Sequence, residues 1–580
     1  MKYTLVPHPP AGGWLPAPRL RRAGGAGAEH MTTNYIPTIG LEIHAELRTK
    51  TKMFCNSKND PDESRPNINI CPVCLAHPGT LPVINGEAIK HVLRVGIALR
   101  GTLADYTEFD RKNYFYPDLP KGYQISQWQH PLVSGGELAG ISITRVHLEE
   151  DTASSIHGST ELTTGSSTSL TMGDDGGKTV IDFNRAGVPL MELVTEPVIK
   201  SAEEAGLFAR ELQLLLRYLG ASEANMEKGE MRVEANVSVA PATEPFASAD
   251  KRRMNAEGRR KNIKIDELIL RNSASGLRNS AVPLGTKVEI KNLNSFRIME
   301  KAVAYEIERQ IKILESGGKV LQETRGWDDR IQKTFPQRTK EGSADYRYFP
   351  DPDLPSLRLF EMSQYDAGML ASELPELPDA RRRRYVALGI KEADASQFVR
   401  EPLLADYFEK VVEPYTQGSL QIVLSANYIA NDLVNFIRLN EHSDRESRDT
   451  GKRDTEFRSE IPLSPQHFRE IINMLASKEI SSRSAKDLLA LAIVDNKSPR
   501  ALAESHMLLQ TGDAAGLEMA VGAILTANPR VVADYLEGKS AALDFLVGAV
   551  MKSLRGAADP TAIRDALQKA ISISREGSSG

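Results

Sequence analysis

The chain has 580 residues, of which 41% are hydrophobic and 26% are charged, and its formal net charge is −5. A chain of this length folds into roughly two to four domains, and its weakly acidic balance excludes a general attraction to nucleic acid, so any such contact requires a local basic patch. No apolar run approaches the ~20 residues of a membrane span, so we expect no membrane association. Three cysteines in so long a chain indicate a reducing compartment without a disulfide framework.

Residues 1–30 have the composition of a disordered extension. Residues 1–28 are rich in Pro, Gly and Ala and carry four basic residues but no acidic one. A mitochondrial transit peptide is normally rich in serine, and this segment contains none. We expect either a disordered extension or a start codon assigned too early, with Met31 as the working start, and we disfavour a mitochondrial location.

The first clear element is a strand at Ile39–Leu47, I-G-L-E-I-H-A-E-L, in which apolar and polar residues alternate. Its apolar residues suit a core, while Glu42, His44 and Glu46 face the opposite side at intervals of about 7 Å. Carboxylates combined with an imidazole suit a divalent cation such as Mg²⁺. From this strand alone, a sheet with one solvated polar face is an open alternative.

Three cysteines follow this strand, namely Cys55 and the C-P-V-C pair Cys71 and Cys74. A structural zinc site normally has four ligands. Ser57 stands where a C-x-C pattern would place a fourth cysteine, and His77 is a candidate substitute. We favour three inert cysteines over a zinc site, and both interpretations stay open at this point.

The segment Asp110–Gln127, D-R-K-N-Y-F-Y-P-D-L-P-K-G-Y-Q-I-S-Q, combines aromatic residues, prolines and charges without a regular period. This composition predicts a long surface loop, and a long loop rich in aromatic residues is often a binding loop. Its basic residues suit phosphate groups, and its tyrosines offer stacking surfaces. A loop that its aromatic residues simply fasten to the core is an equal alternative.

A second strand with acidic residues is predicted at Ile141–Asp151, which ends in three consecutive acids. Alternation places Glu149 on the face of Ile141 and Ile143, and Glu150 on the opposite face. Of these two acids we choose Glu150 as the metal ligand, because it points away from the isoleucines.

Two later segments repeat the arrangement. In Met231–Val239, the valines and one alanine face a core, while Arg232 and Glu234 face the other side. Val288–Lys291, V-E-I-K, places an acid and a lysine on one face. Acids repeated beside a basic residue on distant strands are typical of a site that binds a metal ion and phosphate together.

The other long elements are predicted to be helices. Ser201 is the N-cap of a helix over Ala202–Leu219, and Asn294–Ser316 forms a second, amphipathic helix. The C-terminal part divides into a helical domain at residues 370–440, a charged linker at 441–460 and a final helical module at 461–577.

Seven long motifs, in order from Ile39 to Pro355, resemble the B subunits of the tRNA-dependent amidotransferases, the GatB family. They are G-L-E-I-H-A-E-L, C-P-V-C-L-A-H-P-G-T-L-P-V-I-N, D-R-K-N-Y-F-Y-P-D-L-P-K-G-Y-Q-I-S-Q, H-L-E-E-D, N-R-A-G-V-P-L-M-E-L-V-T-E-P, K-V-E-I-K-N-L-N-S-F-R and D-Y-R-Y-F-P-D-P-D-L-P. The resemblance implies an α+β fold, with a glutamine-synthetase-like cradle domain built on an antiparallel sheet over residues 31–356. All-α domains follow, and the last is a YqeY-like tail.

The resemblance also implies an activity. Such a protein is an ATP-dependent ligase that uses Mg²⁺ to phosphorylate the side-chain carboxyl of Glu or Asp misacylated on tRNA(Gln) or tRNA(Asn). Ammonia from a separate amidase subunit then displaces the phosphate, and a small third subunit makes up the heterotrimer. The implied location is the cytoplasm of a bacterium or archaeon.

The strand patterns and the resemblance together give the candidate site residues. The catalytic candidates are Glu42, His44, Glu150, Glu289 and Lys291. The candidate Mg²⁺ ligands are Glu42, His44, Glu149, Glu150, Glu234 and Glu289. The candidate ATP-binding residues are Arg111, Lys112, Tyr114, Lys121, Arg232, Asn292 and Asn294. Cys55, Cys71 and Cys74 are the candidate zinc ligands, and Arg483, Lys486, Lys552 and Arg555 are candidates for contact with the tRNA backbone.

The sequence departs from the family pattern at Ser57, which interrupts F-C-x-C, and at Glu234, where an aspartate is common. Two other classes of function stay open. One is a free-standing ATP-dependent ligase acting on a small amino acid, and the other is a non-catalytic tRNA-binding scaffold whose polar strand faces are merely solvated. The sequence does not choose between charged Glu-tRNA and Asp-tRNA.

Overall fold

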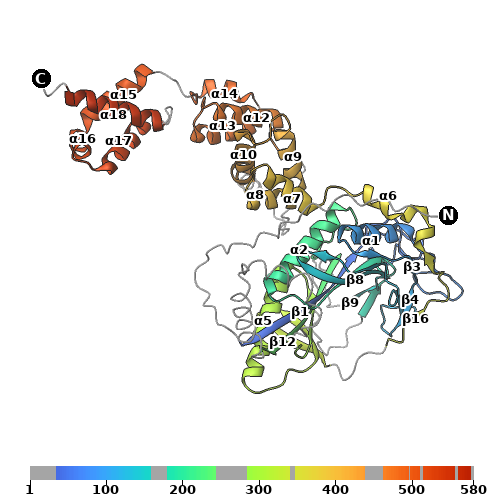
Figure 1. Ribbon diagram of the computed structural model, residues 1–580. Helices are drawn as coiled ribbons and strands as arrows, with labels where there is room; N and C mark the ends of the chain where they lie inside the picture. The colour runs from blue at the N-terminus through green and yellow to red at the C-terminus, as the bar shows by residue number, and fades with distance from the viewer. Residues whose placement is uncertain are drawn as a thin grey trace, which may run out of the picture.

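The computed structural model describes residues 34–157, 179–242, 284–339, 346–437, 461–495, 497–509, 514–554 and 560–576. The predicted extension at residues 1–30 and the predicted linker at 441–460 lie outside these ranges. A sheet domain comes first, and two helical bodies follow it along the chain (Figure 1). Within the described ranges, no helix has both the length and the apolar character that a membrane crossing requires.

The strands are β1 Tyr35–Glu46, β2 Thr102–Leu103, β3 Tyr106–Thr107, β4 Asp110–Asn113, β5 Tyr123–Ser126, β6 Val133–Ser134, β7 Glu137–Leu138, β8 Ile141–Glu150, β9 Ser154–His157, β10 Thr179–Asp182, β11 Pro189–Thr195, β12 Met231–Pro241, β13 Val288–Leu293, β14 Glu323–Asp328, β15 Lys333–Thr339, β16 Phe349–Pro350 and β17 Leu357–Arg358.

The helices are α1 Gly86–Ala98, α2 Ala202–Tyr218, α5 Phe296–Glu315, η1 Leu359–Glu361, η2 Ser363–Tyr365, α6 Ala367–Ser372, α7 Pro378–Ala387, α8 Glu392–Arg400, α9 Pro402–Val412, α10 Leu420–Asn427, η3 Tyr428–Leu433, α12 Pro465–Ala476, α13 Ser482–Asp495, α14 Pro499–Ser505, α15 Ala514–Ala527, α16 Pro529–Leu536, α17 Ser540–Ser553 and α18 Pro560–Glu576.

The main sheet has the strand order β15-β14-β13-β12-β1-β11-β8-β6-β2, and β7 also pairs with β8. Its strand pairs are antiparallel except for β13 and β14, which run parallel. The predicted α+β class is confirmed, with a mixed sheet followed by helices. β1 lies in the middle of the sheet, so its polar residues have neighbours from both sides.

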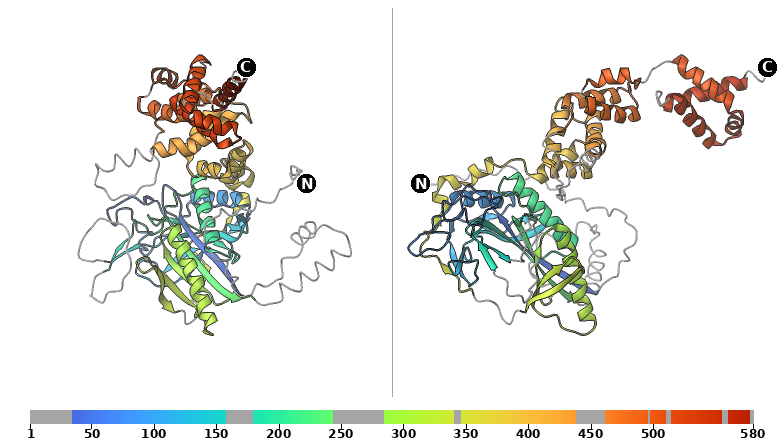
Figure 2. Two further views of the ribbon diagram at one scale, coloured as in Figure 1. Left: turned by 90° about the vertical axis from the view of Figure 1, so that its left-hand side faces the viewer. Right: turned by 180° about the vertical axis from the view of Figure 1, so that it is seen from behind.

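Helices α1, α2 and α5 cover one face of the sheet (Figures 1 and 2). The apolar residues of β1 point into this layer, and Ile39, Leu41 and Ile43 are at most 1% exposed. The predicted cap of α2 is confirmed, because the Ser201 hydroxyl accepts the backbone N–H of Glu204 at 3.1 Å. The helix layer therefore takes up the apolar face of the sheet and leaves the polar face for other contacts.

The segment predicted as a long surface loop is a hairpin of β4 and β5, to which β16 adds a third strand. Each strand of the hairpin has only four residues, which is too short for a period to stand out in the sequence. The hairpin packs against β8, since the side-chain amide of Gln124 donates to the carbonyl of Glu150 at 2.8 Å. It thereby lies beside the polar face of the sheet.

The helical part is divided differently from the prediction. Phe468 on α12 and Leu488 on α13 share a hydrophobic core with Phe398 and Phe408 on the preceding helices. A separate core begins with α15, around Leu546 of α17. The boundary between the helical bodies therefore follows α14 and does not fall at residues 441–460. A run of charge shows where core residues are lacking, but it does not show which helices on either side share a core.

The first helical body is fastened to the sheet domain through α2. The Tyr218 hydroxyl donates to the carbonyl of Val399 at 2.8 Å, and Arg382 forms an ion pair with Glu211 at 2.9 Å. The second body, α15 to α18, lies farther from the sheet (Figure 1).

Candidate active site

The polar face of the sheet gathers ionisable side chains because residues paired across strands share a face. His44 on β1 lies opposite Glu192 on β11 and opposite Arg232 on β12. Glu192 in turn lies opposite His147 on β8. Side chains from four adjacent strands therefore meet around His44.

His44 is the centre of this group. Its Nε2 lies 3.4 Å from Glu149 Oε1, 3.4 Å from Glu192 Oε2 and 3.9 Å from Glu42 Oε1. His147 Nε2 lies 3.4 Å from the same oxygen of Glu192. We call these five residues, Glu42, His44, His147, Glu149 and Glu192, the acid–histidine cluster.

Burial and neighbouring charges perturb the titration of the cluster. Burial alone would lower the pKa of His44, but its hydrogen bonds with Glu149 and Glu192 raise that pKa well above its ordinary value. Burial opposes ionisation of Glu192, yet His147 and His44 hold its pKa well below the usual range. Burial, followed by the charge of Glu192, raises the pKa of Glu42. The cluster thus couples the titration of His44 to that of the carboxylates around it.

A second group of acids adjoins the cluster. Glu234 lies opposite Glu42, and Lys291 Nζ lies 2.8 Å from Glu234 Oε2 and 3.4 Å from Glu289 Oε1. The hydroxyl of Thr324 donates to Glu289 at 2.8 Å. Glu42, Glu234, Glu289 and Lys291 therefore share one face of the sheet, as the sequence pattern predicted.

A third group lies at the other end of β1. Arg232 donates to Asp151 at 2.7 Å, and Arg185 lies 3.6 Å from the same carboxylate oxygen. Burial and the nearby charge of Asp151 raise the pKa of Glu46 to about 8. Arg232, a predicted ATP-binding residue, is thus already paired with an acid.

Lys112 on β4 connects the hairpin with the cluster. Burial alone would lower its pKa, but the charges of Glu149 and Glu192 raise it above the ordinary value. Tyr114 of the same hairpin donates its hydroxyl to Gln124 at 3.3 Å. Of the basic residues predicted in this segment, Lys112 is the one whose charge interacts with the acids of the acid–histidine cluster.

The choice of Glu150 over Glu149 is not supported by the geometry. Glu150 lies on the other face of β8, where it accepts the backbone N–H of Ile125 at 2.9 Å and pairs with Lys121 at 2.5 Å. Glu149 is the residue that contacts His44. The choice assumed unbroken alternation along β8, but the pairing of β8 with β11 is irregular at Val194 and Thr195. Ile143 therefore packs in the core with Val146 and Leu148, on the opposite side from His147 and Glu149. Lys121, predicted to bind ATP, is paired with Glu150 instead.

Arg111 is also placed differently from the prediction. Its guanidinium pairs with Asp351 at 3.0 Å and with Asp353 at 2.8 Å. It therefore fastens the segment after β16 to the hairpin, and the geometry does not offer it to a phosphate. Asn292 and Asn294 are exposed at the end of β13, where Asn292 has a φ of +60° at an irregularity in the pairing with β12.

Sequence reasoning missed Glu192 and His147 as members of the cluster. Glu192 is the only acid in β11, P-L-M-E-L-V-T, and it is 5% exposed. An acid in a short apolar strand is costly to bury unless it has a partner, and that isolated charge was the available signal. His147 shares the face of Glu149, so the alternation of β8 also pointed to it.

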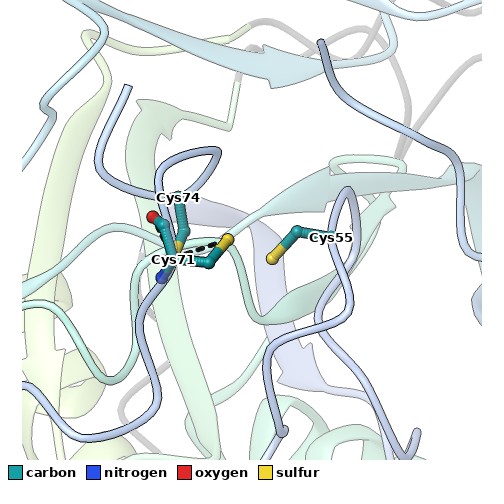
Figure 3. A group of neighbouring side chains, drawn as sticks. All are labelled: Cys55, Cys71 and Cys74. Atoms are coloured by element: carbon teal, nitrogen blue, oxygen red, sulfur yellow. Dashed lines mark hydrogen bonds between the residues drawn. The ribbon is translucent and has the colours of Figure 1, made fainter. Parts of the chain in front are cut away.

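The three cysteine side chains lie together (Figure 3), and their sulfur atoms are all within 4.8 Å of one another. Ser57 Oγ and Lys52 Nζ each lie 3.9 Å from Cys74 Sγ. A hydrogen bond from Cys55 lowers the pKa of Cys74 to about 4. Three sulfur ligands suit zinc, which normally takes four ligands, and the nearby groups of Ser57 and Lys52 are a hydroxyl and an ammonium, not a fourth thiolate.

The predicted tRNA-contacting residues lie on both helical bodies. Arg483 and Lys486 are on α13, where Lys486 pairs with Asp432 at 2.6 Å. Lys552 is exposed on α17. Arg555 lies outside the described residues.

The donor set of the acid–histidine cluster fits a divalent cation. Ligand atoms of Glu42, His44 and Glu192 lie within 4.8 Å of one another, as do those of His147, Glu149 and Glu192. Hard carboxylate oxygens with few nitrogens are the ligands of Mg²⁺ or Mn²⁺. Among the residues that the structure describes, the Nδ1 atoms of two buried histidines of the sheet domain, His91 and His147, find no hydrogen-bond partner, and His147 belongs to the cluster.

Comparison with known proteins identifies the class of this chain, in which a mixed sheet with an acid–histidine cluster precedes helical bodies: it is an aminoacyl-tRNA amidotransferase subunit. Residues 37–264 and 272–363 match the GatB/GatE catalytic domain, and residues 406–571 match the GatB domain. The chain belongs to the GatB family, the B subunits of the tRNA-dependent amidotransferases. These are ligases that form carbon–nitrogen bonds with glutamine as amide donor, and the family depends on ATP.

Bacterial relatives are similar over almost their whole length, and three of them are named as B subunits of aspartyl/glutamyl-tRNA(Asn/Gln) amidotransferases. The relative from Crocosphaera subtropica is 38% identical over 559 residues, which is 94% of this chain and 99% of that protein. The relatives from Carboxydothermus hydrogenoformans and Persephonella marina are 37% and 38% identical, over 92% of this chain in both cases and 98% and 99% of their own lengths.

Proposed function

We propose that the acid–histidine cluster is the site where ATP phosphorylates the side-chain carboxyl of Glu or Asp carried by tRNA(Gln) or tRNA(Asn). The observation that carries this proposal is the convergence of Glu149, Glu192 and His44 beside Lys112. Acids that compete for one imidazole and face a lysine suit a metal ion and phosphate together. The choice of substrates is supported by the relatives, which are aspartyl/glutamyl-tRNA(Asn/Gln) amidotransferase subunits.

In the first step, a carboxylate oxygen of the aminoacyl group bonds to the γ-phosphorus, and ADP leaves with the electron pair of the broken P–O bond. Lys112 would hold phosphate oxygens as the charge shifts, while Lys291 would stay paired with Glu234 and Glu289 at the edge of the site. Mg²⁺ held by Glu149 and Glu192 would neutralise charge on the transferred group.

In the second step, ammonia bonds to the activated acyl carbon, phosphate leaves, and the nitrogen loses one proton. Glu42 is the base we assign to that proton. Its raised pKa makes it a better acceptor than an ordinary carboxylate, and it lies at the less buried edge of the cluster.

The ammonia must come from a partner. The sequence has no G-x-S-x-G elbow and no Ser-Ser-Lys cluster of the amidase type, and none of its three cysteines forms a plausible glutaminase pair with a histidine. We infer a heterotrimer in which an amidase subunit supplies the ammonia and a small third subunit is also present. We place this assembly in the bacterial cytoplasm, and we assign tRNA backbone contacts to the helical bodies.

The test is ADP release with each charged tRNA in the absence of an amide donor. ADP should form with charged Glu-tRNA(Gln) or Asp-tRNA(Asn) and not with free glutamate or aspartate. Turnover on the free amino acid would indicate a free-standing ligase. Unchanged turnover after His44→Ala would indicate that the chemistry lies elsewhere.

A further inference from the structure

Five aromatic rings form a continuous row beside the acid–histidine cluster. Trp128 and Tyr348 are stacked, with ring centroids 4.8 Å apart and planes at 10°. Tyr346 lies 6.0 Å from Tyr348 and 5.9 Å from Tyr114, which lies 6.0 Å from Tyr116. We call Trp128, Tyr348, Tyr346, Tyr114 and Tyr116 the aromatic row.

Two cations join the row to the cluster. The Lys112 ammonium lies 5.2 Å from the centroid of the Tyr346 ring, and the Arg145 guanidinium lies 5.3 Å from that of Trp128. Arg145 also lies 3.8 Å from Glu192. The same positive groups therefore contact both the rings and the acids.

Much of the row is open to solvent. Trp128 is 47% exposed, Tyr116 is 58% exposed and Tyr346 is 36% exposed. Large aromatic side chains usually bury most of their surface, and exposed apolar groups gathered in one place often mark a binding site.

The rings are not needed to hold their segments together. The backbone N–H of Asn113 already donates to the carbonyl of Tyr346 at 2.9 Å, and its side-chain amide donates to that of Arg347 at 2.8 Å. β16 continues this attachment by pairing with β4. A purely structural explanation therefore leaves the solvent exposure of Trp128, Tyr116 and Tyr346 unexplained.

We propose that the aromatic row stacks against the unpaired nucleotides at the 3′ end of the charged tRNA. Aromatic faces interleaved with cations are the usual platform for single-stranded nucleic acid, because every base has a π-face and every linkage a phosphate. Several rings in sequence suit several consecutive bases, whereas ATP offers only one. The inference rests on the proposed function, since the aminoacyl group would then meet the cluster where Lys112 joins the two sites.

The experiment is a binding cycle with the full-length chain, using intact tRNA and the same tRNA without its three 3′-terminal nucleotides. Removing those nucleotides should weaken binding by about 5- to 100-fold in the wild-type protein. In Trp128→Leu and in Tyr346→Leu, removing the 3′-terminal nucleotides should weaken tRNA binding much less than in the wild-type protein, because a ring that those nucleotides stack on is gone. Trp128→Phe keeps an aromatic ring and should show most of the wild-type dependence on the 3′-terminal nucleotides. Trp327→Phe, a control on β14, should behave as wild type.

Equal losses in the wild-type protein and both leucine variants would overturn the proposal. So would a rise in the KM for ATP in place of the change in tRNA binding, since the rings would then serve the adenine of ATP. Because the cycle measures the binding of uncharged tRNA without ATP, its result does not depend on phosphorylation. A chain that binds as expected but releases no ADP would refute the proposed function and not this inference.

Discussion

Consecutive acids at the end of β8 give the sharpest test of the proposed metal site. Glu149 contacts His44 on the polar face, and Glu150 pairs with Lys121 on the opposite face. Both side chains are nearly fully buried, at 2% and 4% exposure. Replacing each in turn by Gln keeps the shape and removes one charge, so the two variants are matched controls for one another.

Both variants should be less stable than the wild-type protein. Glu150→Gln removes the acid that pairs with Lys121, and Glu149→Gln removes one of the two acids nearest to His44, which keeps Glu192. Breaking such a pair costs about 3–5 kcal/mol. Stability alone therefore does not separate them. What separates them is the additional stability that Mg²⁺ provides, because a cation that binds only the folded protein raises its free energy of unfolding.

Losing one carboxylate ligand should weaken Mg²⁺ binding by about tenfold or more, which removes about 1.4 kcal/mol of that additional stability. For a domain of this size the difference is about 2 °C in the Mg²⁺-dependent rise in Tm. We expect Glu149→Gln to show a smaller Mg²⁺-dependent rise in Tm and Glu150→Gln to keep the wild-type rise, as measured by thermal unfolding with and without excess MgCl₂. If Glu150→Gln lost the Mg²⁺ response while Glu149→Gln kept it, the assignment of ligands to the polar face would be wrong.

Four further outcomes are expected. The pKa of Glu46 is raised to about 8 in the folded protein, so the free energy of unfolding of the wild-type protein should fall progressively from about pH 4.5 to 8, where only the unfolded chain ionises this group. Glu46→Gln should therefore be more stable than wild type across that range, by at most about 5 kcal/mol. Asp151→Asn should be less stable than wild type at pH 7, and urea unfolding measures both variants. The purified protein should hold less than one equivalent of zinc by metal analysis, and Ser57→Cys, which adds a sulfur near Cys74, should hold one. Lys552→Glu should raise the KM for charged tRNA and leave kcat nearly unchanged. The slope of log affinity for tRNA against log salt concentration should become shallower by about one unit. Lys539→Glu, a control that loses its surface pairs with Asp534 and Glu537, should show neither change. The pure chain should release no ammonia from glutamine, and release by the isolated chain would contradict the division of labour.

The sequence predicted best where alternation is long and one face is clearly apolar. In β1, Ile39, Leu41 and Ile43 are buried, while Glu42 and His44 lie on the opposite face of the strand. The N-cap of α2 at Ser201 was equally predictable, since it depends on a few adjacent residues. Strand order was not predictable from local pattern, and it is the order that brings His44 of β1 against Glu192 of β11 and Glu149 of β8.

The predicted site residues that the geometry does not favour have one feature in common, an adjacent residue of like charge. Lys112 reaches the cluster while adjacent Arg111 pairs with Asp351, and Glu149 reaches it while adjacent Glu150 pairs with Lys121.

In a strand, adjacent side chains point to opposite faces, so one of each pair must leave the site. Composition and charge cannot say which one, because both members suit phosphate or metal equally well. The decision depends on which face the partner strand presents. A buried charge on the wrong face then needs a counter-charge of its own, and Asp351 and Lys121 supply it. The second charge of each pair thus fastens the hairpin in place, and it is this attachment that holds Lys112 and the aromatic row beside the acids.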